Sequence, residues 1–150
     1  MKVKIKKVRD NAILPSYATT GAAGMDMYTA NEEPVTLKPL QRELIPLGVA
    51  IELEEGYVAK IYPRSGLAAK KGVTLSNCTG IIDCDYRGEI MASLVNLSYD
   101  EYTVQPGDRV CQMIIMPVEK AELTEVEELG STERGAGGFG HTGFDKNTLQ

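Results

Sequence analysis

The chain has 150 residues, of which 43% are hydrophobic and 25% are charged; this balance excludes a disordered or fibrous protein and suits one ordinary domain. A formal net charge of -5 disfavours a duplex-binding surface, because an acidic field repels phosphates unless basic groups gather locally. No window approaches the ~20 apolar residues of a membrane span, and residues 1–9 alternate charged and apolar side chains instead of forming the core of a signal peptide.

Short strands separated by turns are the elements predicted along most of the chain. Glycine and proline recur at intervals that interrupt most long helices, which excludes a helical bundle. Between them, apolar residues alternate or run together at residues 3–5, 47–53, 58–61, 90–97 and 110–118. Several short strands with turn signals predict an all-β sandwich or barrel.

One short helix is predicted at residues 65–72. Ser65 is placed to cap its first turn, Lys70 and Lys71 fall in its last turn, and Gly72 is placed to end it. The backbone N–H groups at the start of such a helix are free to bind an anion.

The residues after 118 form two segments of different composition. Residues 119–129 have a helix-like composition, but their apolar residues match helical spacing only roughly, and we expect a strand there. After Gly130, five glycines crowd into a tail with almost no aliphatic side chains, which cannot bury enough surface to fold alone. We therefore expect a domain at 1–130 and a flexible arm at 131–150, which is either a frayed terminus or a segment that folds over a ligand.

The cysteines give no sign of a disulfide framework or a metal site. Cys78, Cys84 and Cys111 form an odd set without a Cys-x-x-Cys pair, and the single histidine cannot complete a zinc site with them at a familiar spacing. Reduced thiols in a cytoplasmic protein are expected.

Two polar clusters in the first half of the chain suit a nucleoside triphosphate. Residues 23–27 place Asp26 in a turn just before a strand, and residues 63–68 gather an arginine, a hydroxyl and free N–H groups at the helix start. The second combination suits phosphate oxygens. Each cluster also has a structural explanation: a turn-forming aspartate for residues 23–27, and simple helix capping for residues 63–68.

A third cluster, at residues 77–90, is a polar turn between apolar strands. Its backbone and the Asn77 amide can meet the edge of a base. Asp83 follows two isoleucines, where we expect a carboxylate to be partly desolvated and a better acceptor for a water proton. The structural alternative for this region is an ordinary hairpin loop, and Asp85 is expected to face solvent.

Two further clusters complete the set. Residues 107–112 form a turn that enters a strand, for which the structural alternative is a pair between Asp108 and Arg109. Within the tail, Arg134 offers a cation to phosphate and Phe139 offers a ring for stacking.

In order and content, these five clusters resemble the five motifs of the homotrimeric dUTPases, which hydrolyse dUTP to dUMP and pyrophosphate. The likeness runs from about Pro15 to Gly143. It implies a jelly-roll-like (β-clip) subunit with one short helix and a glycine-rich C-terminal arm, assembled as a trimer with shared active sites. One subunit would bring the uracil-binding turn, a neighbour the phosphate-binding motifs, and the third its arm.

The resemblance also implies residue roles. Asp83 matches the carboxylate that activates the water attacking the α-phosphorus, Tyr86 the ring that excludes a 2′-hydroxyl, and Asp26 a carboxylate that helps hold Mg²⁺ through water. The other substrate-binding positions it implies are Arg64, Ser65, Gly66 and Gln112 for phosphates, Asn77, Gly80 and Ile82 for uracil, and Arg134, Phe139, Gly140, His141 and Thr142 in the arm.

Gly66 and His141 stand where many members of the family have serine, which affects the number of phosphate hydrogen bonds. The activity would limit uracil incorporation into DNA and supply dUMP for dTMP synthesis. Two alternatives stay open. A dCTP deaminase-like enzyme of the same fold is disfavoured by residues 68–71 and by the complete arm, and a nucleotide-dependent regulatory binding protein is disfavoured by the intact motifs.

Overall fold

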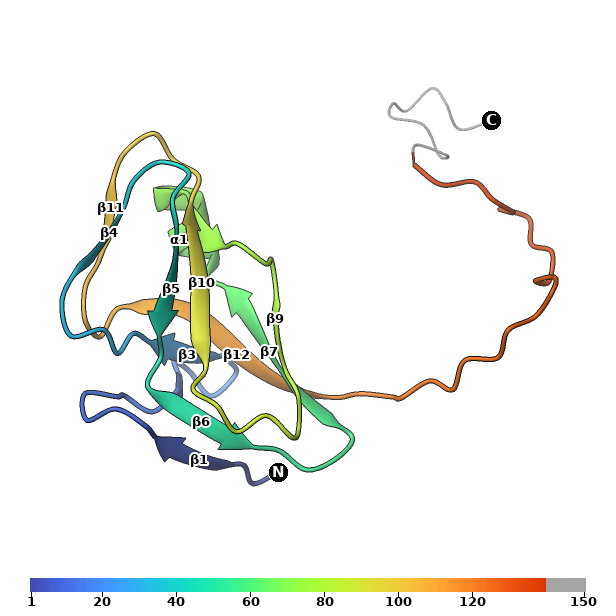
Figure 1. Ribbon diagram of the computed structural model, residues 1–150, viewed down its shortest axis with the longest axis horizontal. Helices are drawn as coiled ribbons and strands as arrows, with labels where there is room; N and C mark the ends of the chain where they lie inside the picture. The colour runs from blue at the N-terminus through green and yellow to red at the C-terminus, as the bar shows by residue number, and fades with distance from the viewer. Residues whose placement is uncertain (140–150) are drawn as a thin grey trace. The chain divides into compact units, whose positions relative to one another are not determined.

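The computed structural model describes residues 1–139, which contain twelve short strands and a single helix (Figure 1). All of these elements lie in one compact unit, Met1–Lys120. From Ala121 to Phe139 the described chain has neither helix nor strand. The change of structure therefore comes before the change of composition at Gly130.

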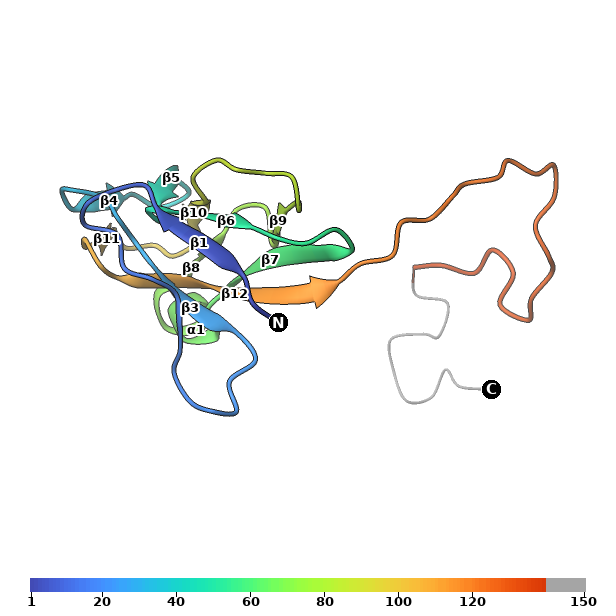
Figure 2. The same cartoon turned by 90° about the horizontal axis from the view of Figure 1, so that it is seen from below.

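The strands pair into two larger sheets and two ribbons, all antiparallel. The five-stranded sheet has the order β2 (Ser16–Tyr17), β3 (Met25–Tyr28), β12 (Arg109–Pro117), β7 (Tyr57–Pro63) and β9 (Gly80–Ile82). Figure 2 labels the last four of these strands. The three-stranded sheet has the order β5 (Arg42–Pro46), β10 (Met91–Asn96) and β8 (Val73–Leu75). The ribbons are β1 (Lys4–Lys7) with β6 (Val49–Glu52), and β11 (Tyr102–Val104) with β4 (Val35–Leu37).

One core joins the two larger sheets. Met27, Ile61 and Met113 enter it from the five-stranded sheet, and Ile45 and Leu94 from the three-stranded sheet, each at most 2% exposed. The prediction of an all-β fold is confirmed. Each of the five segments predicted from apolar patterning overlaps a strand, namely β1, β6, β7, β10 and β12.

The strand predicted at 119–129 is wrong. β12 ends at Pro117, which lies opposite Tyr57, the first residue of its partner β7. The last bond along this edge runs from Val118 N to Gly56 O, at 2.9 Å. From residue 119 to 139 no strand continues the ladder, and the side chains are exposed.

The predicted helix forms as α1 (Ser65–Lys71) and packs beside β8. Gly72 ends it in the left-handed conformation, with φ 66°, and its N–H donates to Ala68 O at 3.0 Å. The expected cap is wrong. Arg64 is the N-cap residue, no side chain caps the helix, and Ser65 is its first residue.

All three cysteines are free. Cys78 is exposed, Cys84 is half-buried and Cys111 is buried. Burial raises the pKa of the Cys111 thiol to about 12, so this group stays protonated and unreactive. Among residues 1–139, α1 is far too short to cross a membrane.

Candidate active site

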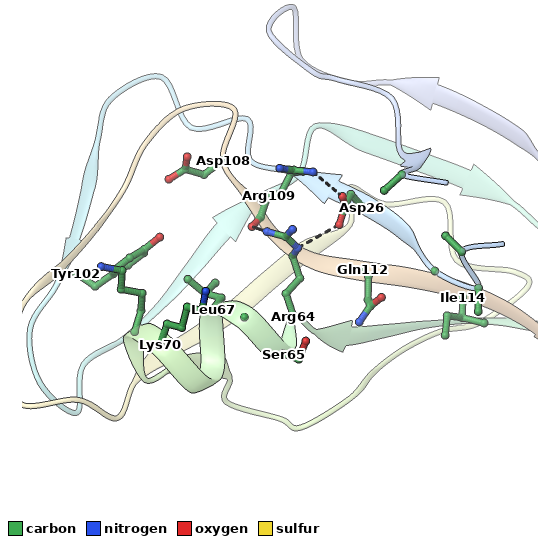
Figure 3. A pocket seen from close by; sticks show the side chains of 16 residues that line it. Asp26, Arg64, Ser65, Leu67, Lys70, Tyr102, Asp108, Arg109, Gln112 and Ile114 are labelled. Carbon is green, nitrogen blue, oxygen red and sulfur yellow. Dashed lines mark hydrogen bonds and ion pairs between the residues drawn. The ribbon is translucent and has the colours of Figure 1, made fainter. Parts of the chain in front are cut away.

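A cavity of about 740 Å³ opens beside the start of α1 (Figure 3). The phosphate and metal positions predicted outside the arm line it, namely Asp26, Arg64, Ser65, Gly66 and Gln112. A Cβ atom on Gly66 would meet nothing within 4 Å, so this position has open space for a side chain. The structure thus brings together residues that lie up to 86 positions apart in the chain.

The five-stranded sheet explains why these residues meet. Gln112 on β12 lies opposite Asp26 on β3 and opposite Tyr62 on β7. Residues opposite each other in antiparallel strands point to the same face, so Asp26 and Gln112 share one surface of the sheet. Arg64 follows directly after β7, and the Gln112 amide donates from Nε2 to Pro63 O at 3.0 Å. Asp26 itself lies within β3, so its prediction as a turn residue is wrong.

Asp26 is held between two arginines, as Figure 3 shows. Its Oδ1 lies 3.1 Å from Arg64 Nε and its Oδ2 lies 3.0 Å from Arg109 Nη1. The Asp26 side chain is 14% exposed, whereas those of Arg64 and Arg109 are 32% and 48% exposed. Because one carboxylate faces two guanidinium groups, the cluster keeps a positive charge suited to phosphate oxygens.

Arg109 is a cavity residue that sequence reasoning missed, since it was considered only as a structural partner of Asp108. That pair does not form. Asp108 instead accepts from Gln105 N at 2.8 Å. On a regular strand Arg109 and Gln112, three positions apart, would point to opposite faces. A register shift between Arg109 and Cys111 changes this alternation, and both side chains reach the cavity.

A second cavity, of about 270 Å³, holds the predicted catalytic residue. Asp83, Ile82 and Tyr86 line it, and it shares no lining residue with the first cavity. The Asp83 side chain is exposed in the single chain, so the expectation that two neighbouring isoleucines desolvate it is wrong. Those neighbours do not cover it, because Ile81 itself points to solvent and is 55% exposed. Asp85 is exposed as expected.

The predicted uracil positions lie on and before β9. Gly80 and Ile82 belong to this edge strand, which pairs with β7 on one side only among the described strands. An edge strand presents backbone N–H and C=O groups that a base can bind. Asn77 is exposed in the preceding turn. The structural alternative of an ordinary hairpin loop around Asp83 and Asp85 is wrong, since the flanking strands β9 and β10 belong to different sheets.

The arm residues fall partly within the described chain. Arg134 donates from Nε to Gly137 O at 2.8 Å, and the Phe139 ring is fully exposed. Gly140, His141 and Thr142 lie outside the described residues.

The described side chains offer few ligands for a metal ion. Residues 1–139 contain no cluster of three or more histidine, cysteine, aspartate or glutamate side chains that could hold an ion. Both oxygens of Asp26 already face arginines. This set fits Mg²⁺ bound mainly by water and substrate phosphates, with one carboxylate accepting from a bound water, because Mg²⁺ keeps its waters and seldom uses an all-protein cage.

Comparison with known proteins points to one family. A family model described as dUTPase matches residues 10–143. A deoxyuridine 5'-triphosphate nucleotidohydrolase from Finegoldia magna is 55% identical, over 96% of this chain and 100% of the relative. A protein of the same name from a Hydrogenobaculum species is 52% identical, over 96% of this chain and 99% of the relative.

Solved structures show the same likeness. A mutant dUTPase of Staphylococcus bacteriophage 80alpha with dUpNHpp has a TM-score of 0.87 and 27% identity, over 95% of this chain and 99% of that one. A mutant dUTPase from phage phi11 of S. aureus, described with a structural Mg(II) ion, has a TM-score of 0.79 and 26% identity, over 87% and 100%. These matches confirm the predicted fold.

Proposed function

Because this chain belongs to the dUTPase family, we propose that it hydrolyses dUTP to dUMP and pyrophosphate. The observation that carries the proposal is the cavity that gathers Asp26, Arg64, Ser65 and Gln112 around an excess of positive charge. The reaction keeps uracil out of DNA and supplies dUMP for dTMP synthesis. The cytoplasm, where the nucleotide is made and used, is its proposed location.

In this proposal the first cavity binds the triphosphate. Guanidinium groups bind phosphate oxygens in pairs through their planar N–H fork, and Arg64 and Arg109 both retain exposed donor surface. Ser65 and the Gln112 amide add neutral donors at the same opening. Asp26 would help to hold Mg²⁺ through water, and the ion would supply charge neutralisation at the phosphates when bound.

The second cavity orients the water and the nucleoside. Asp83 accepts a proton from a water molecule that attacks the α-phosphorus, and pyrophosphate leaves. Tyr86 lies beside it, where its ring can pack under a deoxyribose and leave no space for a 2′-hydroxyl. The exposed edge of β9 and Asn77 read the uracil.

The separation of these residues supports a shared site. One chain places the phosphate positions and Asp83 in two cavities without a common residue, so we propose that a complete site takes one cavity from each of two neighbouring copies. The arm, proposed as residues 131–150 beside a domain at 1–130, comes from a third copy. Arg134 then contacts phosphate and Phe139 covers the uracil.

An apolar groove supports association of the copies into a homotrimer. Its volume is about 470 Å³, and it is lined mainly by apolar side chains. Among them Met1 is 69% exposed, Leu14 46% and Tyr17 56%. Apolar surface of this extent commonly marks a protein interface. In solution we expect a particle with three times the mass of the 150-residue chain.

A substrate panel tests the proposal. Pyrophosphate release is measured for dUTP, dCTP, dTTP and UTP, with and without Mg²⁺, beside a sizing column. We expect release from dUTP in the presence of Mg²⁺ and at least about 10²-fold less from the other three, because steric exclusion and unpaired polar groups discriminate strongly. Ammonia release from dCTP would favour the deaminase instead. Binding of dUTP without cleavage would favour a regulatory protein.

A further inference from the structure

One carboxylate joins three segments that are distant in the sequence. Arg9 donates to Glu89 twice, from Nε to Oε1 at 2.6 Å and from Nη2 to Oε2 at 3.0 Å. The backbone N–H of Gly48 donates to the same Oε1 at 3.0 Å. The Glu89 side chain is 21% exposed and that of Arg9 is 37% exposed. A bidentate pair with a third donor fixes both the position and the orientation of the carboxylate.

The Gly48 end of this junction is rigid. Gly48 has φ +70°, and a Cβ atom there would lie 2.6 Å from Ala12 Cβ and 2.7 Å from Ala30 Cβ. Only glycine satisfies both the left-handed backbone and this close approach. Its carbonyl accepts from Val8 N at 2.9 Å. Gly48 therefore fixes Glu89 and the residue before Arg9 to the same point of the core.

The other end of the junction is the loop that carries the proposed catalytic residue. Tyr86 N donates to Asp83 O at 3.1 Å and closes a turn. Tyr86 Oη donates to the carbonyl of Glu89 at 3.0 Å, and its ring occupies the space that a side chain on Gly88 would need. Asp83, Tyr86 and Glu89 line the same cavity. The Tyr86 ring is therefore linked to the backbone of Glu89 by its hydroxyl group.

The pKa shifts of Arg9 and Glu89 favour the charged form of each side chain. The hydrogen bond from Arg9 is the main cause that lowers the pKa of Glu89, and the same bond raises the pKa of Arg9. Both directions mean that the charged forms persist at neutral pH. The fold does not need the pair to hold the end of the loop, because Ile90 is anchored separately by Ile90 N to Val49 O and Leu47 N to Ile90 O, at 2.9 and 3.1 Å.

We propose that Arg9 and Glu89 are positioning residues for the proposed dUTP hydrolysis, on which this inference rests. By holding the loop at 83–89 against Gly48, they keep the Asp83 carboxylate in line for the water and the Tyr86 ring under the sugar. Without the pair, the loop stays anchored at Ile90 but loses its side-chain link to Gly48 and the segment at Arg9. Turnover then falls, since small displacements of reacting groups are costly, and the preference for dUTP over UTP falls because the ring is displaced.

Steady-state kinetics of paired variants test this role. We expect Glu89→Gln and Arg9→Met each to lower kcat by about tenfold, with a smaller change in KM, and to reduce the dUTP preference over UTP. Arg9→Lys keeps the charge and recovers part of both losses. The double variant is no worse than either single one, because each single change already breaks the bidentate ion pair. Glu52→Gln, which breaks the exposed Lys4–Glu52 pair at 2.8 Å, is the control and changes neither quantity.

Three outcomes distinguish a positioning role from a purely structural one and from failure of the proposed function. Variants with lower thermal stability but wild-type kcat and selectivity would overturn the positioning role. Should the Glu89 and Arg9 variants fail to fold, Tyr86→Phe keeps the ion pair and removes only the hydroxyl bond to the Glu89 carbonyl. It is expected to reduce selectivity, and unchanged selectivity would overturn the proposal. A wild-type protein that does not cleave dUTP would instead refute the proposed function.

Discussion

Replacing Asp83 by asparagine is expected to remove most of the turnover of dUTP while leaving the affinity for the nucleotide near that of the wild type. The amide has the shape of the carboxylate but cannot accept the proton of the attacking water. A positioned general base contributes about 10²- to 10⁴-fold, so kcat is expected to fall by that range. The phosphate-binding side chains line a separate cavity and remain in place, which preserves binding.

Single-turnover kinetics and calorimetric binding of a non-hydrolysable analogue measure the two quantities separately. Asp85→Asn is the matched control, because Asp85 lies two positions further along and is also exposed. It does not line either of the two cavities described above and should leave both quantities unchanged. Near-normal turnover by Asp83→Asn would exclude Asp83 as the base.

Deleting every residue after Glu133 is expected to reduce kcat/KM by roughly 10²-fold or more, because the truncated protein loses a phosphate contact and a stacking ring at once. The core is expected to survive. All described strands and α1 lie within Met1–Lys120, and the described residues beyond Ala121 add neither helix nor strand. Circular dichroism and the thermal midpoint of the truncated protein should therefore match those of the full chain.

A shorter truncation provides the control for the arm. Removing only the residues after Gly143 leaves the whole fifth motif and is expected to preserve activity. Arg134→Ala measures the part of the loss that is due to phosphate binding, and Phe139→Ala measures the part that is due to stacking. If the longer truncation retained wild-type kinetics, the arm would have no part in the active site.

Strong apolar patterns predicted the strands of the core. β6, β7, β10 and β12 all contain buried residues, so burial selects their side chains and leaves a readable pattern. Strands such as β2, β4 and β11 have two or three residues and depend on a distant partner, as in the pairing of Val104 with Val35. Local sequence carries no signal for such pairings. The wrong strand at 119–129 has the same cause, since β7, the partner of β12, begins at Tyr57 and offers nothing to pair with beyond Pro117.

The gathering of the phosphate positions around one cavity could be predicted from the family motifs, whereas contacts that depend on the tertiary structure could not. Asp26, Arg64 and Gln112 meet as the motifs imply. Arg109 was missed because a register shift in β12 redirects its side chain. Glu89 was missed because its partner, Arg9, lies 80 positions away. Neither contact follows from spacing along the chain.

Turnover of dUTP in water enriched in oxygen-18 tests the central claim most directly, with mass spectrometry of both products. Attack of an Asp83-activated water on the α-phosphorus places the heavy oxygen in dUMP and leaves pyrophosphate unlabelled. Label in the pyrophosphate would show attack at the β-phosphorus and would contradict the proposed mechanism.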